Sequence, residues 1–187
     1  MTELPKYVEV KRIPVEGFPR VGKDYLTEDE VNLLFGPGRK VVQEKIDGKS
    51  EWEMTKKAQV FYEFCKYRHS IPYTHLPAWK IAFDVWDTVN DCWADPIVYR
   101  ILHRRFGWNF APTLIEPLKA FDLEDVVVLL KSHSAYNPDH QIEGVVIKNY
   151  DQNIFGKIVN PEFEDEVSSG VHPQKRRIQE MNRLEFT

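Results

Sequence analysis

The sequence predicts an α+β fold, and two patterns lead to that prediction. Segments rich in β-branched and aromatic residues, which favour strands, dominate the centre of the chain. Segments with helix caps and stop signals come between them, without the regular strand–helix alternation of a doubly wound parallel sheet. We therefore expect antiparallel sheets flanked by helices.

The expected strands are short runs with paired β-branched or aromatic residues. They lie at residues 6–13, 39–45, 58–68, 80–89, 143–150 and 154–160. Only the tripeptide "DQN" separates the last two, a spacing typical of a β-hairpin. These two strands are therefore expected to pair with each other.

The expected helices have capping residues at their starts and glycine at their ends. In residues 26–38, Thr27 caps the helix, Glu30 completes a capping box and a Gly-Pro-Gly run stops it. Residues 95–107 begin with Asp-Pro and end at glycine, as a helix does. We expect a third helix, capped by Asp122, at residues 122–134, and a fourth that begins in residues 161–169.

Length and composition limit the classes of protein that fit. The 187 residues suffice for one domain or a compact two-lobed one. A net charge of −4 argues against a generally basic coat for nucleic acid. Cys65 and Cys92 have no metal-ligand spacing, which argues against a zinc site or a disulfide framework. Without an apolar leader or an 18-residue apolar run, we expect a soluble, cytoplasmic protein with no membrane partner.

Five segments in a fixed order carry the functional signal. They read "EKIDG" (44–48), "YEFCKYRHSIPY" (62–73), "IAFDVWD" (81–87), "EGVVIK" (143–148) and "FGKIVNPEF" (155–163). A Lys-x-Asp-Gly run alone is weak evidence, because a surface lysine before an Asp-Gly turn is common. Five such elements in order, each in a strand-like context, form a specific pattern.

This pattern resembles the covalent nucleotidyltransferase superfamily of DNA ligases, RNA ligases and mRNA capping enzymes. It is most similar to compact ATP-dependent RNA ligases without an OB domain, over roughly residues 6–165. The resemblance implies an ATP-grasp-like ligase domain at residues 1–169, followed by a polar, basic tail at residues 170–187.

The resemblance also implies an activity, its cofactors and its partner. The activity is RNA ligation, as in RNA repair, through a covalent lysyl-AMP intermediate. AMP passes to an RNA 5′-phosphate, and a 3′-hydroxyl then displaces it. The cofactors are ATP and a divalent metal, Mg²⁺ or Mn²⁺, and the partner is RNA with those two ends.

Seven residues match the positions that act in this superfamily. The resemblance implies Lys45 as the nucleophile and Glu143 as the metal-linked carboxylate. It implies nucleotide binding by Glu44 (adenine edge, largely through its backbone carbonyl), Glu63 (ribose), Phe83 (stacking on the base), and Lys148 and Lys157 (phosphates).

A nucleophilic lysine must be a neutral amine, so its pKa has to fall from about 10.4. Nearby cations and partial burial both lower it. We expect Lys148 and Lys157 to supply those cations, as exposed charges whose removal leaves stability nearly unchanged.

The chain departs from the family pattern at three places. Only 18 positions separate Lys45 from Glu63, and this link contains no arginine to contact the ribose or the incoming phosphate. Tyr62 stands where glycine is usual, and Phe155 stands where a basic residue is common. These differences question efficient end joining more than nucleotide binding.

Two other interpretations stay open from the sequence. One is a DNA ligase or a GTP-using guanylyltransferase of the same superfamily, which the missing extra domains disfavour. The other is a non-catalytic nucleotide-binding or RNA-binding module that retains the pocket. The short link favours this module somewhat.

Overall fold

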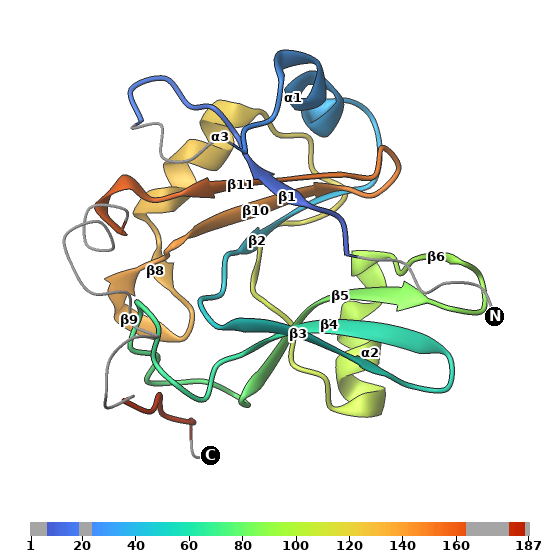
Figure 1. Ribbon diagram of the computed structural model, residues 1–187, viewed down its shortest axis with the longest axis vertical. Coiled ribbons are helices and arrows are strands. Elements are labelled where there is room, and N and C mark those ends of the chain that lie inside the picture. Colours follow the sequence, from blue (N-terminus) through green and yellow to red (C-terminus); the bar gives the residue numbers. More distant parts are fainter. Residues whose placement is uncertain (1–6, 19–23, 164–179, 186–187) are drawn as a thin grey trace.

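The computed structural model describes residues 7–18, 24–163 and 180–185, and these form two main sheets with helices on their outer faces (Figure 1). A five-stranded sheet has the order β1-β11-β10-β2-β7, and a four-stranded sheet has the order β3-β4-β5-β6. A small two-stranded sheet, β8-β9, lies beside them. The α+β prediction is therefore confirmed.

The five-stranded sheet is antiparallel except where β1 pairs with β11 in parallel. Its strands are β1 (Val10–Arg12), β2 (Lys40–Glu44), β7 (Thr113–Ile115), β10 (Gly144–Asn149) and β11 (Ile154–Val159). The hairpin expected between the last two strands is confirmed by their register, in which Val146 lies opposite Lys157. Gly144 suits its position, since a Cβ there would lie 2.2 Å from the carbonyl oxygen of Ile158.

Helices cover the outer face of this sheet. They are α1 (Glu28–Phe35), α3 (Leu123–Val128) and the short 3₁₀ helix η2 (Leu129–Lys131). The predicted capping box is present, with Thr27 and Glu30 each accepting a backbone hydrogen bond from the other's N–H. Leu34 of α1 and Val126 of α3 are fully buried against Val42 and Ile147 of the sheet.

The four-stranded sheet has α2 on its own outer face. Its strands are β3 (Lys49–Met54), β4 (Ala58–Phe64), β5 (Lys80–Asp87) and β6 (Cys92–Trp93). The 3₁₀ helix η1 (Pro96–Val98) leads into α2 (Tyr99–Phe106), which ends at Gly107 in the left-handed conformation. Tyr99 packs against Val60 and Tyr62 of β4.

An aromatic cluster joins the inner faces of the two sheets. Phe61 and Trp93 come from the four-stranded sheet, and Phe155 comes from the five-stranded one. Tyr7 lies among them, with ring centroids 4.9 to 5.8 Å from those three. The cluster borders a pocket between the sheets, because Tyr7 also lines that pocket.

Several elements differ from the sequence-based expectation. Strands β3, β6, β7, β8 (His133–Ser134) and β9 (Asn137–Gln141) were not predicted. The helix expected at 122–134 is shorter, because it tightens into η2 and then enters β8. Residues 161–163 are helical, whereas the rest of the helix expected there lies outside the described residues.

The predicted boundary between residues 169 and 170 also lies outside the described residues. Of the expected tail, residues 180–185 are described, and they lie against residues 65–76. None of the described helices has the length and apolar character needed to span a membrane.

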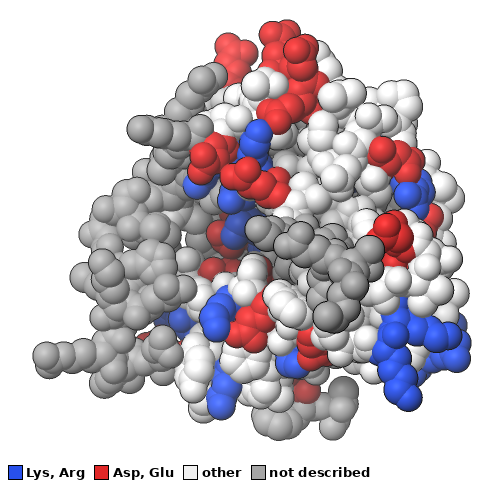
Figure 2. All heavy atoms as spheres, turned by 45° about the vertical axis from the view of Figure 1, so that its right-hand side comes forward, with Lys and Arg blue, Asp and Glu red and all other residues white. Residues whose placement is uncertain are grey.

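Charges of both signs are interspersed over the face shown in Figure 2, and the densest group of basic side chains is at its lower right. This distribution agrees with the net charge of −4, which argued against a general basic coat.

Candidate active site

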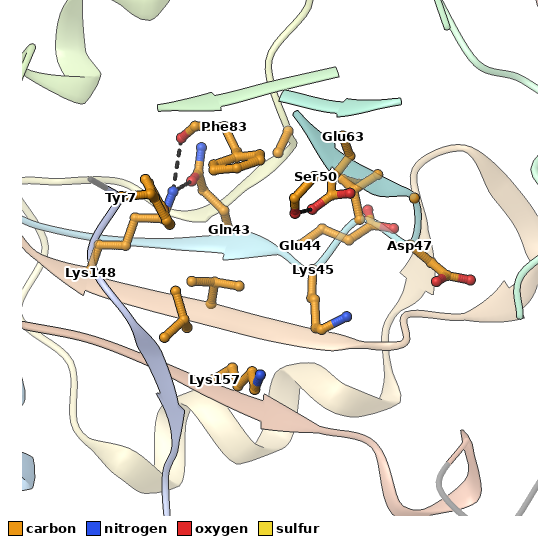
Figure 3. Close-up of a pocket in the computed structure, with 15 residues that line it drawn as sticks. Tyr7, Gln43, Glu44, Lys45, Asp47, Ser50, Glu63, Phe83, Lys148 and Lys157 are labelled. Carbon is orange, nitrogen blue, oxygen red and sulfur yellow. Dashed lines mark hydrogen bonds between the residues drawn. The ribbon is translucent and has the colours of Figure 1, made fainter. Parts of the chain in front are cut away.

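A cavity of about 280 Å³ lies between the inner faces of the two sheets (Figure 3). Six of the seven predicted site residues line it: Glu44, Lys45, Glu63, Phe83, Lys148 and Lys157. The seventh, Glu143, contacts Lys45 directly. The fold therefore brings together side chains from β2, β4, β5, β10 and β11 that are far apart in sequence.

Lys45 and Glu143 are held together by the pairing of β2 with β10. Lys45 directly follows β2 and donates its backbone N–H to the carbonyl oxygen of Gly144 at 2.9 Å. Glu143 directly precedes β10, so the two side chains meet, with Lys45 Nζ 2.6 Å from Glu143 Oε1. The second carboxylate oxygen of Glu143 is buried and has no hydrogen-bond partner among the described residues.

The electrostatics of Lys45 differ from the expectation of a lowered pKa. Burial lowers the pKa of its amine, but the carboxylates of Glu143 and Asp47 outweigh burial and raise it. The amine is therefore a cation paired with Glu143 in this structure, and the pair must be disturbed before the amine can act as a nucleophile.

Asp47 positions the loop that follows Lys45, a role that the sequence analysis did not assign. Its Oδ2 accepts hydrogen bonds from the backbone N–H groups of Ser70 and, at 3.0 Å, of Ile71. Its own N–H donates to the hydroxyl of Tyr73 at 2.8 Å. The Asp-Gly pair after the lysine was the available signal, but its distant partners are not visible in sequence.

Glu63 contributes a second carboxyl group to the pocket. It lies opposite Ser50 in the β3–β4 pair, and the Ser50 hydroxyl donates a hydrogen bond to its Oε1. The Oε2 atom is buried without a partner among the described residues. Burial raises the pKa of Glu63 to about 7. This carboxyl group therefore keeps its proton to a higher pH than an ordinary glutamate does.

The side chain of Glu44 turns away from the pocket. Its carboxylate accepts hydrogen bonds from the hydroxyl of Ser134 at 2.5 Å and from the N–H of Ala135 at 3.1 Å. Burial raises the pKa of this carboxyl group. The side chain therefore fixes the start of the β8–β9 hairpin, which leaves the backbone of Glu44 to line the cavity.

Lys148 is buried and not the exposed charge that the sequence suggested. Its side chain is 1% exposed, and its Nζ lies 2.7 Å from Asp84 Oδ2. The same amine donates to the carbonyl oxygen of Phe83 at 2.8 Å and to Gln43 Oε1 at 2.7 Å (Figure 3). The expectation of an exposed charge is therefore wrong, and it no longer gives a reason to expect that loss of this side chain is neutral for stability.

Gln43 and Phe83 form the end of the pocket next to Lys148. The Lys148 contact fixes the Gln43 amide, whose Nε2 is buried without a partner in the described part of the chain. The half-buried Phe83 ring presents an aromatic surface to the cavity. Sequence analysis missed Gln43, because a glutamine in a strand carries no signal of its own.

Lys157 is a half-buried cation of the pocket. Burial lowers its pKa first, and the positive charges of Lys45 and Arg12 lower it further. No salt bridge to Lys157 is found among the described residues. It is therefore well placed to meet a negatively charged ligand.

The donor atoms of this site fit a divalent cation. Carboxylate oxygens are the ligands that Mg²⁺ and Mn²⁺ prefer, and Glu143 offers a buried, unpartnered one. In the part of the chain that the structure describes, no group of three or more His, Cys, Asp or Glu side chains is arranged to hold a metal by itself.

Comparison with solved structures shows a similar fold in an RNA ligase of Naegleria gruberi. The structure of that protein with pyrophosphate has a TM-score of 0.56 and 14% identity, and the match covers 91% of this chain and 64% of that one. A variant of it with ATP and manganese has a TM-score of 0.53 and 13% identity, with 90% and 63% covered. This chain thus spans less than two thirds of those proteins.

Sequence comparisons give the family. No curated protein matches the chain. A model of the RNA ligase family matches residues 39–160, which include Lys45, Glu63, Phe83, Glu143 and Lys157. Because this match covers most of the chain and contains the whole cavity-lining set from β2 to β11, the chain belongs to the RNA ligase family.

Proposed function

We propose that this chain is an ATP-dependent RNA ligase that acts through a covalent lysyl-AMP intermediate on Lys45. The pocket carries this proposal: it holds a half-buried amine against a carboxylate, next to a second cation. Three buried polar atoms there, Gln43 Nε2, Glu63 Oε2 and Glu143 Oε2, lack partners among the described residues. Such atoms call for an explanation, and a bound polar nucleotide supplies one.

In the first step, Lys45 Nζ attacks the α-phosphorus of ATP. A nitrogen–phosphorus bond forms, the bond from that phosphorus to the β-phosphate oxygen breaks, and pyrophosphate leaves. The ammonium group must first lose a proton. Glu143 Oε1, 2.6 Å away, is the atom placed to hold that proton.

The negative charge of the phosphates needs compensation in this step. Lys157, without a carboxylate partner among the described residues, is the side chain placed to give it. A divalent cation held at Glu143 would add charge neutralisation. It would also offset the negative charge of that carboxylate and so lower the pKa of the Lys45 amine. Solved structures of the Naegleria RNA ligase with ATP and manganese support this choice of ligands.

The next two steps transfer the AMP and seal the RNA. An oxygen of the RNA 5′-phosphate attacks the phosphorus of the lysyl-AMP, the nitrogen–phosphorus bond breaks, and the Lys45 amine is restored. A 3′-hydroxyl then attacks the RNA 5′-phosphorus and AMP leaves. The substrates are thus ATP and RNA with a 5′-phosphate and a 3′-hydroxyl.

Denaturing mass analysis after incubation with each NTP and with Mg²⁺ or Mn²⁺ tests the first step. We expect an AMP adduct with ATP, and none in Lys45→Arg, because arginine keeps the charge but offers no usable neutral amine. Lys49→Arg is the matched control, since Lys49 is an exposed neighbour paired with Glu51. An adduct on Lys45→Arg contradicts the assignment.

The same experiment separates the alternatives. A GMP adduct would indicate capping chemistry. Nucleotide binding without any adduct would indicate a non-catalytic module, which the arginine-free β3–β4 hairpin and the raised pKa of Lys45 favour. Transfer of the adduct to a DNA 5′-phosphate in preference to RNA would indicate a DNA ligase.

A further inference from the structure

The described end of the chain, residues 180–185, is attached to the loop at residues 65–76. The N–H of Arg68 donates to the carbonyl oxygen of Glu180 at 2.8 Å, and the N–H of Asn182 donates to that of Lys66 at 3.1 Å. Farther along, the N–H of Arg183 donates to the carbonyl oxygen of Tyr73 at 2.9 Å. The two segments therefore make repeated backbone contacts across more than one hundred positions of sequence.

Asn182 is the buried centre of this attachment. The residue is 5% exposed, and its Oδ1 accepts a hydrogen bond from the N–H of Tyr73 at 2.9 Å. Its Nδ2 donates to the carbonyl oxygen of Cys65 at 2.8 Å and to that of Tyr67 at 3.3 Å. One side chain thus fixes both ends of the loop between residues 65 and 73.

The same loop holds the residues just after the nucleophile. Tyr73, which is 1% exposed, accepts a hydrogen bond through its hydroxyl from the N–H of Asp47. The Asp47 carboxylate in turn accepts from the N–H groups of Ser70 and Ile71. A continuous set of contacts therefore runs from Asn182 through Tyr73 to Asp47, two positions after Lys45.

We propose that Asn182 is a positioning residue for Lys45, acting through Tyr73 and Asp47; this inference rests on the proposed function. In-line attack on phosphorus requires the amine at a defined place, and small displacements of a reacting group cost large factors in rate. Asn182 is not among the residues that line the cavity. Its effect is therefore on the rate of attack and not on ATP binding.

The kinetic test compares Asn182→Ala with Glu180→Ala, whose exposed side chain makes one ion pair with Arg68 in the same segment. Adduct formation is followed over a range of ATP concentrations. We expect Asn182→Ala to lower the maximal rate about tenfold to a hundredfold. We expect its ATP concentration for half-maximal rate to stay within about twofold, since stacking and phosphate contacts are untouched. Glu180→Ala should match the unchanged protein.

Tyr73→Phe tests whether Tyr73 connects Asn182 to Asp47. It removes the hydroxyl that accepts from Asp47 and keeps the buried ring. If Asn182 acts through Tyr73, the loss in the double variant is close to that of the larger single loss, since coupled residues are not additive. The proposal would be overturned if the double variant lost the product of the two single fold-losses in maximal rate. It would also be overturned if Asn182→Ala kept the full maximal rate.

Hydrogen exchange at the Asp47 amide, measured without ATP, separates this inference from the proposed function. If the Asp47 amide exchanges faster in Asn182→Ala while the rest of the fold is retained, the coupling is supported. This holds even if the unchanged protein forms no adduct. Unchanged exchange in both Asn182→Ala and the milder Asn182→Asp rejects the coupling. If both variants fail to fold, Asn182 serves folding alone and the proposal is wrong.

Discussion

Lys45 Nζ and Glu143 Oε1 lie 2.6 Å apart although 98 positions of sequence separate the two residues. Strands β2 and β10 create this contact, because Lys45 follows one and Glu143 precedes the other at the same end of the antiparallel pair. The pair keeps the amine charged, so it stabilises a resting state and not the attacking one. Its properties therefore control how adduct formation depends on pH.

Glu143→Gln should move the pH profile of adduct formation to lower pH. In the unchanged protein the neutral amine is favoured only as pH rises through the raised pKa of Lys45, so the rate climbs with pH. Removing the carboxylate takes away a negative charge that raises that pKa, so the pKa falls. We also expect the maximal rate to fall about 10²- to 10⁴-fold, because a proton acceptor is lost.

Single-turnover rates between pH 6 and the onset of unfolding at high pH check this. Glu162→Gln, at an outlying position after β11, is the control. If the single-turnover rate of Glu143→Gln rose over the same pH range as that of the unchanged protein, Glu143 would not set the charge of Lys45.

Glu63 makes the protein less stable as pH rises. Its folded pKa, raised to about 7 from 4.5 by burial, means that the folded state holds the proton more tightly than the unfolded chain. Stability is therefore lost as pH rises from about 4.5 to about 7. Glu63→Gln should remove this loss and be more stable than the unchanged protein above pH 7, by at most about 3 kcal/mol.

Urea unfolding at pH 4.5 and pH 8 tests the sign. The free energy of unfolding of Glu63→Gln should exceed that of the unchanged protein by more at pH 8 than at pH 4.5. The same difference at both pH values would mean that the carboxyl group does not titrate in that range.

Much of the fold followed from local signals, and the exceptions have physical reasons. The capping box of α1 and the β10–β11 hairpin depend on neighbouring residues, so pattern alone located them. Strand β3, "KSEWEM", reads as polar because much of it is exposed, and pairing with β4 makes it a strand. Such pairing depends on distant residues and is invisible in a local window.

The site shows the same division. Motif order brought Lys45 and Glu143 to attention, but it did not show that they pair. Two of the three departures from the family pattern are core residues: Tyr62 packs under α2, and Phe155 is 1% exposed in the aromatic cluster. Neither side chain is free to contact a nucleotide, so the substitutions there reflect packing.

Lys148 and Lys157, although predicted alike, should behave differently when replaced by alanine. Lys148→Ala leaves the fully buried Asp84 without its cation, and breaking a buried pair in this way costs about 3–5 kcal/mol. Lys157→Ala removes a half-buried charge that has no salt bridge among the described residues, and it should cost less than about 1 kcal/mol while abolishing most adduct formation.

Thermal melting and adduct formation are measured on both variants. The double variant Lys148→Met with Asp84→Asn should recover part of the stability, because it removes both charges together. A stable Lys148→Ala, or a Lys157→Ala protein that forms the adduct normally, would contradict these assignments.

Phe83→Ala should weaken nucleotide binding by about 1–3 kcal/mol, the usual value for an aromatic side chain that stacks on a base. The Phe83 carbonyl that accepts from Lys148 belongs to the backbone and is retained. Phe106→Ala, which truncates an aromatic residue that is 54% exposed on α2, is the control. Equal ATP affinity in the two variants would place the base elsewhere.

We expect end joining to be slower than self-adenylylation, because the β3–β4 hairpin contains no arginine. Joining requires the RNA 5′-phosphate in line with the bound AMP, which calls for further cations near the pocket. The link carries only Lys49, Lys56 and Lys57, and Lys49 is already 2.7 Å from Glu51. Arg68 is the nearest arginine in sequence, but it is paired with Glu180 at 2.6 Å. A lysine is a point charge and does not reproduce the two-pronged contact of arginine with phosphate.

The test isolates the adenylylated protein, adds a nicked duplex with a 5′-phosphate and no ATP, and follows AMP transfer and sealing over time. We expect both to lag adenylylation, and Glu180→Ala, which releases Arg68, to narrow the gap. Sealing as fast as adenylylation in the unchanged protein would show that the chain needs no arginine in this link.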